Sequence, residues 1–108
     1  MSDESQIVVP PSFIALYLLP GRSRPSLPRE EIAARHEHCE DLANLLTEQA
    51  SARLWELGLS EDIVLDRIRR GLLVGGTALP VAEAHWVVCR LAELRGWQIP
   101  PADPRPAL

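Results

Sequence analysis

The stretch REEIAARHEHCEDLANLLTEQASARLWEL, residues 29–57, decides the fold class of this chain. It contains neither Pro nor Gly, and Glu30 and Glu31 stand in its first turn, where carboxylates complement the positive end of a helix dipole. Apolar residues recur at spacings of three, four or seven, which is the stripe of an amphipathic helix: Ile32, Cys39, Leu42, Leu46, Ala50 and Leu54 or Leu57.

This pattern predicts one long helix that ends at Gly58. At 1.5 Å per residue such a helix would measure about 43 Å, which is longer than a domain of this size is wide. We therefore expect the helix either to bend near Ala50 and Ser51 or to project toward a partner.

Two more helices are predicted downstream. Ser60 before Glu61 and Asp62 is typical of a helix start, and this helix runs to about residue 73 with four apolar residues buried: Ile63, Val64, Ile68 and Leu72. The third helix begins near Thr77 or Leu79 with Pro80 in its first turn, and Gly96 ends it. Its broad apolar face predicts the most buried helix: Val81, Ala84, Val88, Leu91 and Ala92, widened by Trp86, Val87, Cys89 and Leu94.

Prolines mark the two segments that flank these helices. Five of the ten lie in residues 1–28 and four in residues 100–108. The apolar run at residues 12–19 lies between prolines, and we favour a short helix with Ser12 as its N-cap over a buried strand. The prediction is a single all-α domain, a small three- to four-helix bundle at residues 29–97, with a short apolar N-terminal arm at 1–28 and a flexible Pro-rich tail at 98–108.

Composition excludes several functions. All 11 basic residues are Arg, so the chain has no Lys for a Schiff base or a phosphate loop, and the loop-like run from Gly71 to Thr77 lacks the residue that would hold a phosphate. We expect neither an enzyme nor a cofactor.

Eight uninterrupted apolar-rich residues are too few to span a membrane, and two cysteines 50 positions apart fit thiols in a reducing compartment, so we expect a cytoplasmic protein.

One cluster resembles a metal site. In the run His36-Glu37-His38-Cys39-Glu40-Asp41, a rotation of about 100° per residue puts His36, Cys39 and Glu40 on one helix face and separates the two histidines. The favoured interpretation is a solvated acidic face with Cys39 buried. A metal or proton-transfer site at His36, Cys39 and Glu40 is the alternative, and His85 is expected to be an interior histidine.

Arg67, Arg69 and Arg70 form the basic cluster of the chain. With two helices joined by a Gly-containing turn, they permit a helix-turn-helix interpretation with nucleic acid as the ligand. Arginines at a helix C-terminus also complement the dipole, and a formal charge of −4 gives no general attraction to phosphates. Nucleic-acid binding is therefore the second hypothesis.

The leading hypothesis is a protein–protein interaction module, either an adaptor or a homodimer. It rests on the acidic first helix and on the apolar arm, whose large side chains are available for a partner or a second copy: Phe13, Ile14, Leu16 and Tyr17. The alternative is that the arm folds back over a core that is small for an isolated domain.

The run PPSFIALYLLPGRSRPSLPREEIAARHEHCEDLANLLTEQA resembles the opening of a family of short, uncharacterised proteobacterial proteins, some of which carry the name of a chaperone-type ATPase subunit. The resemblance covers about residues 9–50. It implies a bacterial cytoplasmic protein, but it brings no functional residues to this chain. Because the chain has no Lys, we do not expect ATPase activity from it.

Overall fold

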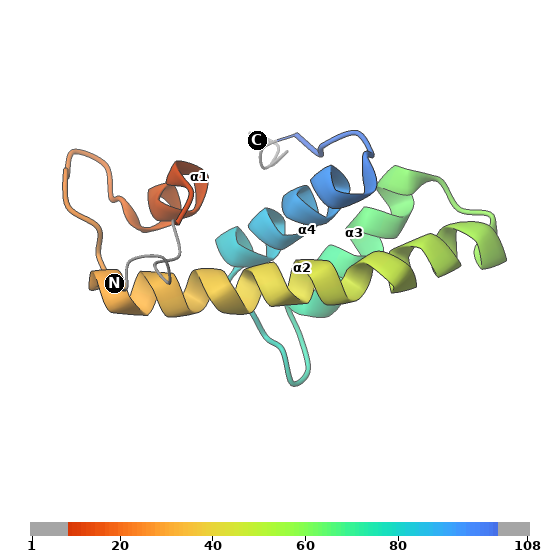
Figure 1. Cartoon of the computed structure of the whole chain (residues 1–108), viewed down its shortest axis with the longest axis horizontal. Helices are drawn as coiled ribbons and strands as arrows, with labels where there is room; N and C mark the ends of the chain where they lie inside the picture. Colours follow the sequence, from red (N-terminus) through yellow and green to blue (C-terminus); the bar gives the residue numbers. More distant parts are fainter. Residues whose placement is uncertain (1–8, 102–108) are drawn as a thin grey trace, which may run out of the picture. The chain divides into compact units, whose positions relative to one another are not determined.

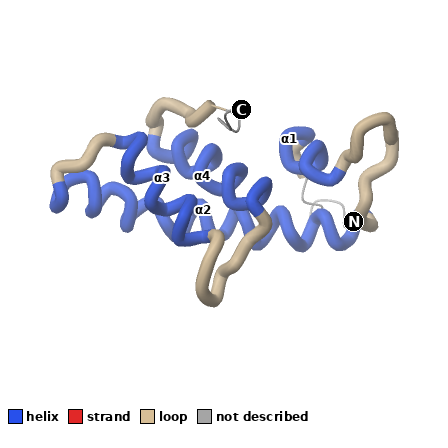
Figure 2. The backbone as a smooth tube through the Cα atoms, turned by 180° about the vertical axis from the view of Figure 1, so that it is seen from behind, coloured by secondary structure: helices blue, strands red, loops and turns tan. Residues whose placement is uncertain are grey.

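A computed structural model describes residues 9–101 and shows an all-α protein (Figures 1 and 2). Four α-helices follow one another: α1 (Pro11–Ile14), α2 (Arg29–Leu57), α3 (Glu61–Leu72) and α4 (Val81–Arg95). A single 3₁₀ turn, η2 (Ala15–Tyr17), continues α1, and residues 9–101 contain no β-strand. The predicted fold class is confirmed.

α2 has the predicted limits and runs through Ala50 and Ser51 without interruption. Gly58, at φ +63°, follows it in the left-handed conformation that a Gly adopts without strain. The buried residues of α2 are Ile32, His36, Cys39, Ala43 and Ala50. Leu57 is exposed, so the prediction that the apolar stripe could end at Leu57 was wrong. The pattern of apolar residues also did not identify His36 and Ala43 as buried.

The structure divides into two compact units, residues 1–38 and 39–108, and the division falls inside α2. The proline pattern predicts that the arm ends at residue 28. In the first unit the Phe13 ring lies 5.4 Å from the His36 ring in an edge-on arrangement and 5.8 Å from the Tyr17 ring. These contacts associate the first turns of α2 with the arm, which explains the later boundary.

Residues 11–17 of the arm are helical, as favoured over a strand, although the helix ends before Leu18, which forms an isolated β-bridge with Pro25. The N-cap of this helix differs from the prediction. Pro10 is the N-cap of α1 and Pro11 the first helical residue, where the missing N–H removes no helical hydrogen bond. Ser12 is therefore inside the helix. Beyond η2, the Ser26 N–H donates to the Tyr17 carbonyl at 2.7 Å, which closes a loop within the arm.

In the second unit α3 and α4 pack together, and α4 carries the largest set of buried residues among the described helices. That part of the prediction is confirmed. Ile63 and Val81 are exposed rather than buried, because each lies in the first turn of its helix on the side away from the core. Glu83, by contrast, is buried with 2% of its surface exposed.

The C-terminal end of α4 reverses the chain. Gly96 has φ +72°, and the Trp97 N–H donates to the Ala92 carbonyl at 2.8 Å, the backbone pattern of a Gly-terminated helix. Residues 98–101 then return along α4, and the Cys89 thiol contacts the Pro100 carbonyl at 4.0 Å. The first four residues of the predicted tail thus belong to the second unit, and residues 102–108 lie outside the described part of the chain.

Within residues 9–101 no helix combines the length and apolar character needed to cross a membrane.

Candidate functional site

A half-open groove of about 550 Å³ lies in the second unit between α3, α4 and residues 98–101. This volume falls within the range of about 300–1,000 Å³ that is usual for ligand sites. Its walls combine charged and apolar side chains: Glu61, Asp62, Leu65, Asp66, Arg69, His85, Val88, Gln98, Ile99, Pro100 and Pro101. It is the candidate functional site of the molecule.

Helical spacing puts the α3 residues on one wall. Asp62, Leu65, Asp66 and Arg69 are separated by three, one and three positions, so they share one face of the helix. Ser60 is the N-cap residue and Glu61 and Asp62 occupy the first turn, as predicted, but the predicted capping hydrogen bond from the Ser60 side chain is absent. Two acidic side chains therefore stand at the helix N-terminus, at the rim of the groove.

The base of the groove is apolar. Val88 of α4 and Leu65 of α3 are both almost completely buried and form the floor. Ile99 and Pro100 close the third side because Gly96 turns the chain back along α4. Ile99 remains half exposed, so an apolar surface is open to a ligand.

The carboxylates of the rim differ in their partners. Asp66 lies 2.9 Å from Arg69 Nη2 and 2.9 Å from Arg70 Nε, so two guanidiniums share its charge. The Ser60 hydroxyl donates to Asp62 Oδ1 at 2.5 Å and lowers the pKa of Asp62 below its ordinary value. Neither Glu61 nor Asp62 forms an ion pair with another described residue, so both charges face solvent at the groove.

His85 and Cys89 lie one turn apart on α4, with 3.4 Å between Nε2 and Sγ. A nucleophilic cysteine needs a thiol pKa below its ordinary value. Burial, and then the negative charge of Glu93, raise the pKa of Cys89 instead. The pair therefore does not supply an activated thiolate.

The structure uses the three candidate metal ligands in other contacts. His36 is buried in the first unit with its ring against Phe13. In the second unit the Cys39 thiol donates to Glu83 Oε1 at 3.7 Å, and burial raises the pKa of Glu83. Among residues 9–101 no three His, Cys, Asp or Glu side chains are grouped so as to hold a metal ion.

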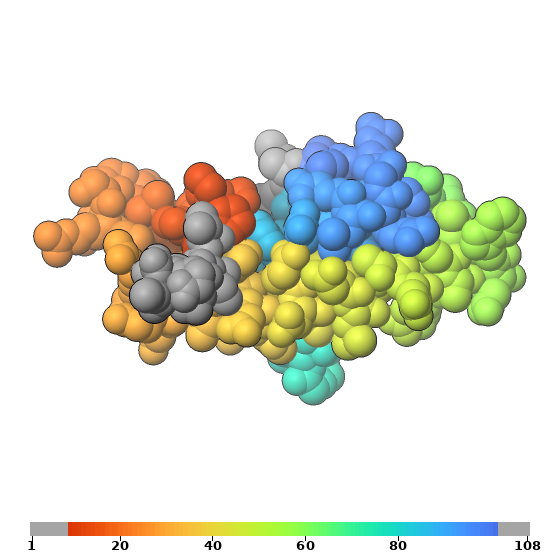
Figure 3. Space-filling view, in the orientation of Figure 1, coloured from red at the N-terminus to blue at the C-terminus, as the bar shows by residue number. Residues whose placement is uncertain are grey.

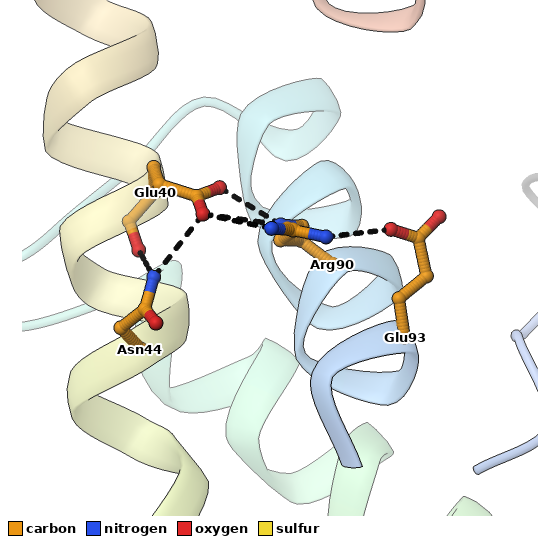
Figure 4. Close-up of polar contacts among 4 residues, drawn as sticks. All are labelled: Glu40, Asn44, Arg90 and Glu93. Atoms are coloured by element: carbon orange, nitrogen blue, oxygen red, sulfur yellow. Dashed lines mark hydrogen bonds and ion pairs between the residues drawn. The ribbon is translucent and has the colours of Figure 1, made fainter. Parts of the chain in front are cut away.

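Glu40, the third candidate ligand, is held by Arg90 (Figure 4). Arg90 Nε lies 2.9 Å from Oε1 and Nη2 lies 3.0 Å from Oε2, while Nη1 lies 3.0 Å from Glu93 Oε1. Asn44 Nδ2 donates to Glu40 Oε2 at 3.2 Å. This network links α2 to α4. Glu40, which was predicted to lie on a solvated acidic face, therefore takes part in a contact between two helices.

The predicted interaction residues have different surroundings. Phe13 is completely buried, so it stabilises the arm and is not available to a partner, whereas Ile14, Leu16 and Tyr17 are half-buried. Arg67 is exposed, but Arg69 and Arg70 both pair with Asp66. The four arm residues belong to the first unit and the three arginines belong to the second.

Sequence reasoning missed the groove. Its rim contains Glu61 and Asp62, which the sequence pattern identifies only as helix-start residues. Its third side comes from Ile99 and Pro100, in a segment expected to be flexible. The acidic residues between positions 61 and 66 were the one pattern in the sequence that could have pointed to the groove. No local pattern indicated that residues 98–101 would turn back along α4.

Comparisons of this chain with protein-family models, with curated proteins and with solved structures found no match.

Proposed function

We propose that this protein is a non-enzymatic module that binds a partner protein through the groove between α3, α4 and residues 98–101. The partner segment carries at least one Arg or Lys beside an apolar side chain. The observation that carries the proposal is the placement of two ion-pair-free carboxylates, Glu61 and Asp62, above an apolar floor of Leu65 and Val88.

The chemistry of the groove supports this choice of ligand. Three carboxylates and one guanidinium line it, and the guanidinium of Arg69 is already paired with Asp66. A cationic side chain therefore meets uncompensated negative charge at the rim, while an apolar neighbour covers Val88 and Ile99. Charges at a rim set orientation and association rate, and buried apolar contact supplies affinity.

The nucleic-acid hypothesis has less support from the same region. Asp66 lies between Arg69 and Arg70 and neutralises part of the basic cluster, which leaves Arg67 as its fully unengaged member among the described residues. Affinity for a phosphate backbone grows with the number of cations that meet phosphates.

Cytoplasmic location is part of the proposal and is supported by Cys39 and Cys89, which are not joined in a disulfide.

Selection from a random peptide library displayed on phage tests the proposal. We expect enriched peptides to combine Arg or Lys with an apolar residue, and their affinity, measured by fluorescence polarisation, to fall as salt is raised. The variant Glu61→Lys/Asp62→Lys should weaken binding at least tenfold, an expectation based on loss of both rim charges.

The matched control is Glu30→Lys/Glu31→Lys. It reverses the same number of charges on two exposed residues in the first turn of α2, so it carries a similar helix-dipole penalty at a place remote in sequence. The control should bind like the wild type. Equal loss in both variants, or the absence of any enriched basic peptide, contradicts the proposal.

A further inference from the structure

The described part of the chain stops at the wall of the groove between α3, α4 and residues 98–101. Pro101 is the last described residue and is also one of the residues that line the groove. Figure 3 shows the last described residues, in the deepest blue, at the surface of the second unit. The sequence continues from this point with ADPRPAL, residues 102–108, so this segment is tethered directly to the groove.

The composition of residues 102–108 matches the ligand inferred for the groove. Arg105 is the one cationic residue of this segment, and apolar residues follow it. The rim offers the carboxylates of Glu61 and Asp62, neither of which forms an ion pair with another described residue. Because a guanidinium forms charge-assisted hydrogen bonds with carboxylates, Arg105 is complementary to this rim.

The tether is long enough for this contact. Arg105 lies four residues beyond Pro101, and four extended residues span up to about 13–14 Å. Pro101 and Asp62 line the same groove of about 550 Å³. Arg105 can therefore reach the rim while residues 98–101 keep their described positions.

The tether also allows a contact of small area to fill the groove. At an effective concentration of about 1 mM, which short linkers provide, a segment with an intrinsic dissociation constant of about 0.3 mM occupies its site about three-quarters of the time. Pro104 and Pro106 restrict the backbone around Arg105, which lowers the entropy cost of docking. Asp103 balances the charge of Arg105, so the segment is held weakly enough for a partner to displace it.

We propose that residues 102–108 dock into the groove when no partner is bound, with Arg105 against Glu61 and Asp62, and that a partner segment has to displace them. This inference concerns the regulation of the groove and therefore rests on the proposed function. A partner meets an empty groove in only a fraction of the molecules, and its apparent affinity falls by that fraction. At the occupancy given above, the loss is about fourfold.

Backbone amide NMR of the full chain without any peptide tests the docking itself. Arg105→Gln removes the charge that meets the rim, so it should shift the amides at 61–66 and 85–88. Arg105→Lys keeps a cation and should retain most of the wild-type positions. Arg24→Gln is the matched control because it removes one positive charge from an exposed residue of the first unit. Groove amides that are unchanged in Arg105→Gln, or shifted equally in Arg24→Gln, would overturn the inference.

Competition separates this inference from the proposed function. The tightest peptide from the phage selection, labelled with fluorescein, should bind Arg105→Gln about fourfold more tightly than the wild type. Arg105→Lys and Arg24→Gln should bind the peptide like the wild type. Equal affinity for Arg105→Gln and the wild type overturns the inference and leaves the proposed function intact. If no peptide binds the groove, the proposed function fails, and the NMR comparison still decides whether residues 102–108 dock.

Discussion

Arg90 on α4 forms a bidentate ion pair with the Glu40 carboxylate on α2, with Nε 2.9 Å from Oε1 and Nη2 3.0 Å from Oε2. The hydrogen bonds to Glu40 raise the pKa of Arg90 above its ordinary value. Both side chains are about two-thirds buried. A planar guanidinium matches a carboxylate in this geometry, and an ammonium group cannot.

This ion pair should stabilise the packing of α2 on α4. In a double-mutant cycle with Glu40→Gln and Arg90→Met, we expect a coupling of about 1 kcal/mol, between the values of exposed and buried pairs. Arg90→Lys should recover less than half of it, because the two-point contact is lost. Urea unfolding measures each variant, and a coupling near zero would show that the pair orients the helices without stabilising them.

A second prediction concerns two leucines with opposite exposure. Leu91 on α4 is fully buried, so Leu91→Ala should lower the free energy of unfolding by about 2–5 kcal/mol. Leu45→Ala should change it by less than about 0.5 kcal/mol because Leu45 faces solvent. Similar losses in both variants would place Leu45 in the core and contradict the described packing.

The hydrogen bond from the Ser60 hydroxyl lowers the pKa of Asp62. The folded-state pKa of Asp62 is lowered, so its contribution to stability is present above the unfolded-state value and is lost as pH falls through the folded-state value. Ser60→Ala should raise this pKa toward its ordinary value, and Ser60→Thr, which keeps the hydroxyl, should leave it low. Carboxyl NMR titration of Asp62 reports the shift directly, and an unchanged pKa in Ser60→Ala counts against the hydrogen bond as its cause.

Cys89 should react slowly with a thiol reagent at neutral pH, because its pKa is raised by burial and by Glu93. Glu93→Gln removes the negative charge and should speed the reaction at about pH 8, near the ordinary thiol pKa. Glu48→Gln is the control on α2. Cys39 is buried and reacts later, so the first kinetic phase of disulfide exchange reports Cys89. A faster reaction in both variants, or in neither, would contradict this role of Glu93.

Local signals in the sequence found the long helices, but α4 begins later than predicted, at Val81, with Pro80 as its N-cap and not in its first turn. Pro and Gly bound α2, Ser60 marks the start of α3, and Gly96 marks the end of α4, so each limit depends on residues next to it. The cap of α1 was misassigned because a hydroxyl residue was preferred over Pro10 and Pro11, which already fix the helical start.

Burial and the groove depend on distant contacts, which periodicity does not report. Glu83 lies on a helix face with apolar neighbours, and only the approach of Cys39 from α2 shows that its carboxylate is interior. The groove joins residue 62 to residue 99, so it exists only after the chain has reversed at Gly96.

The central claim is that a basic and apolar protein segment occupies the groove. Backbone amide NMR of the full chain, titrated with the tightest peptide from the phage selection, locates the contact most directly. We predict saturable shifts of the amides at 61–69, 85–88 and 98–99, with the N-terminal turns of α1 and α2 unchanged. Shifts confined to residues 45–55 of α2, or spread evenly over the chain, would contradict the claim.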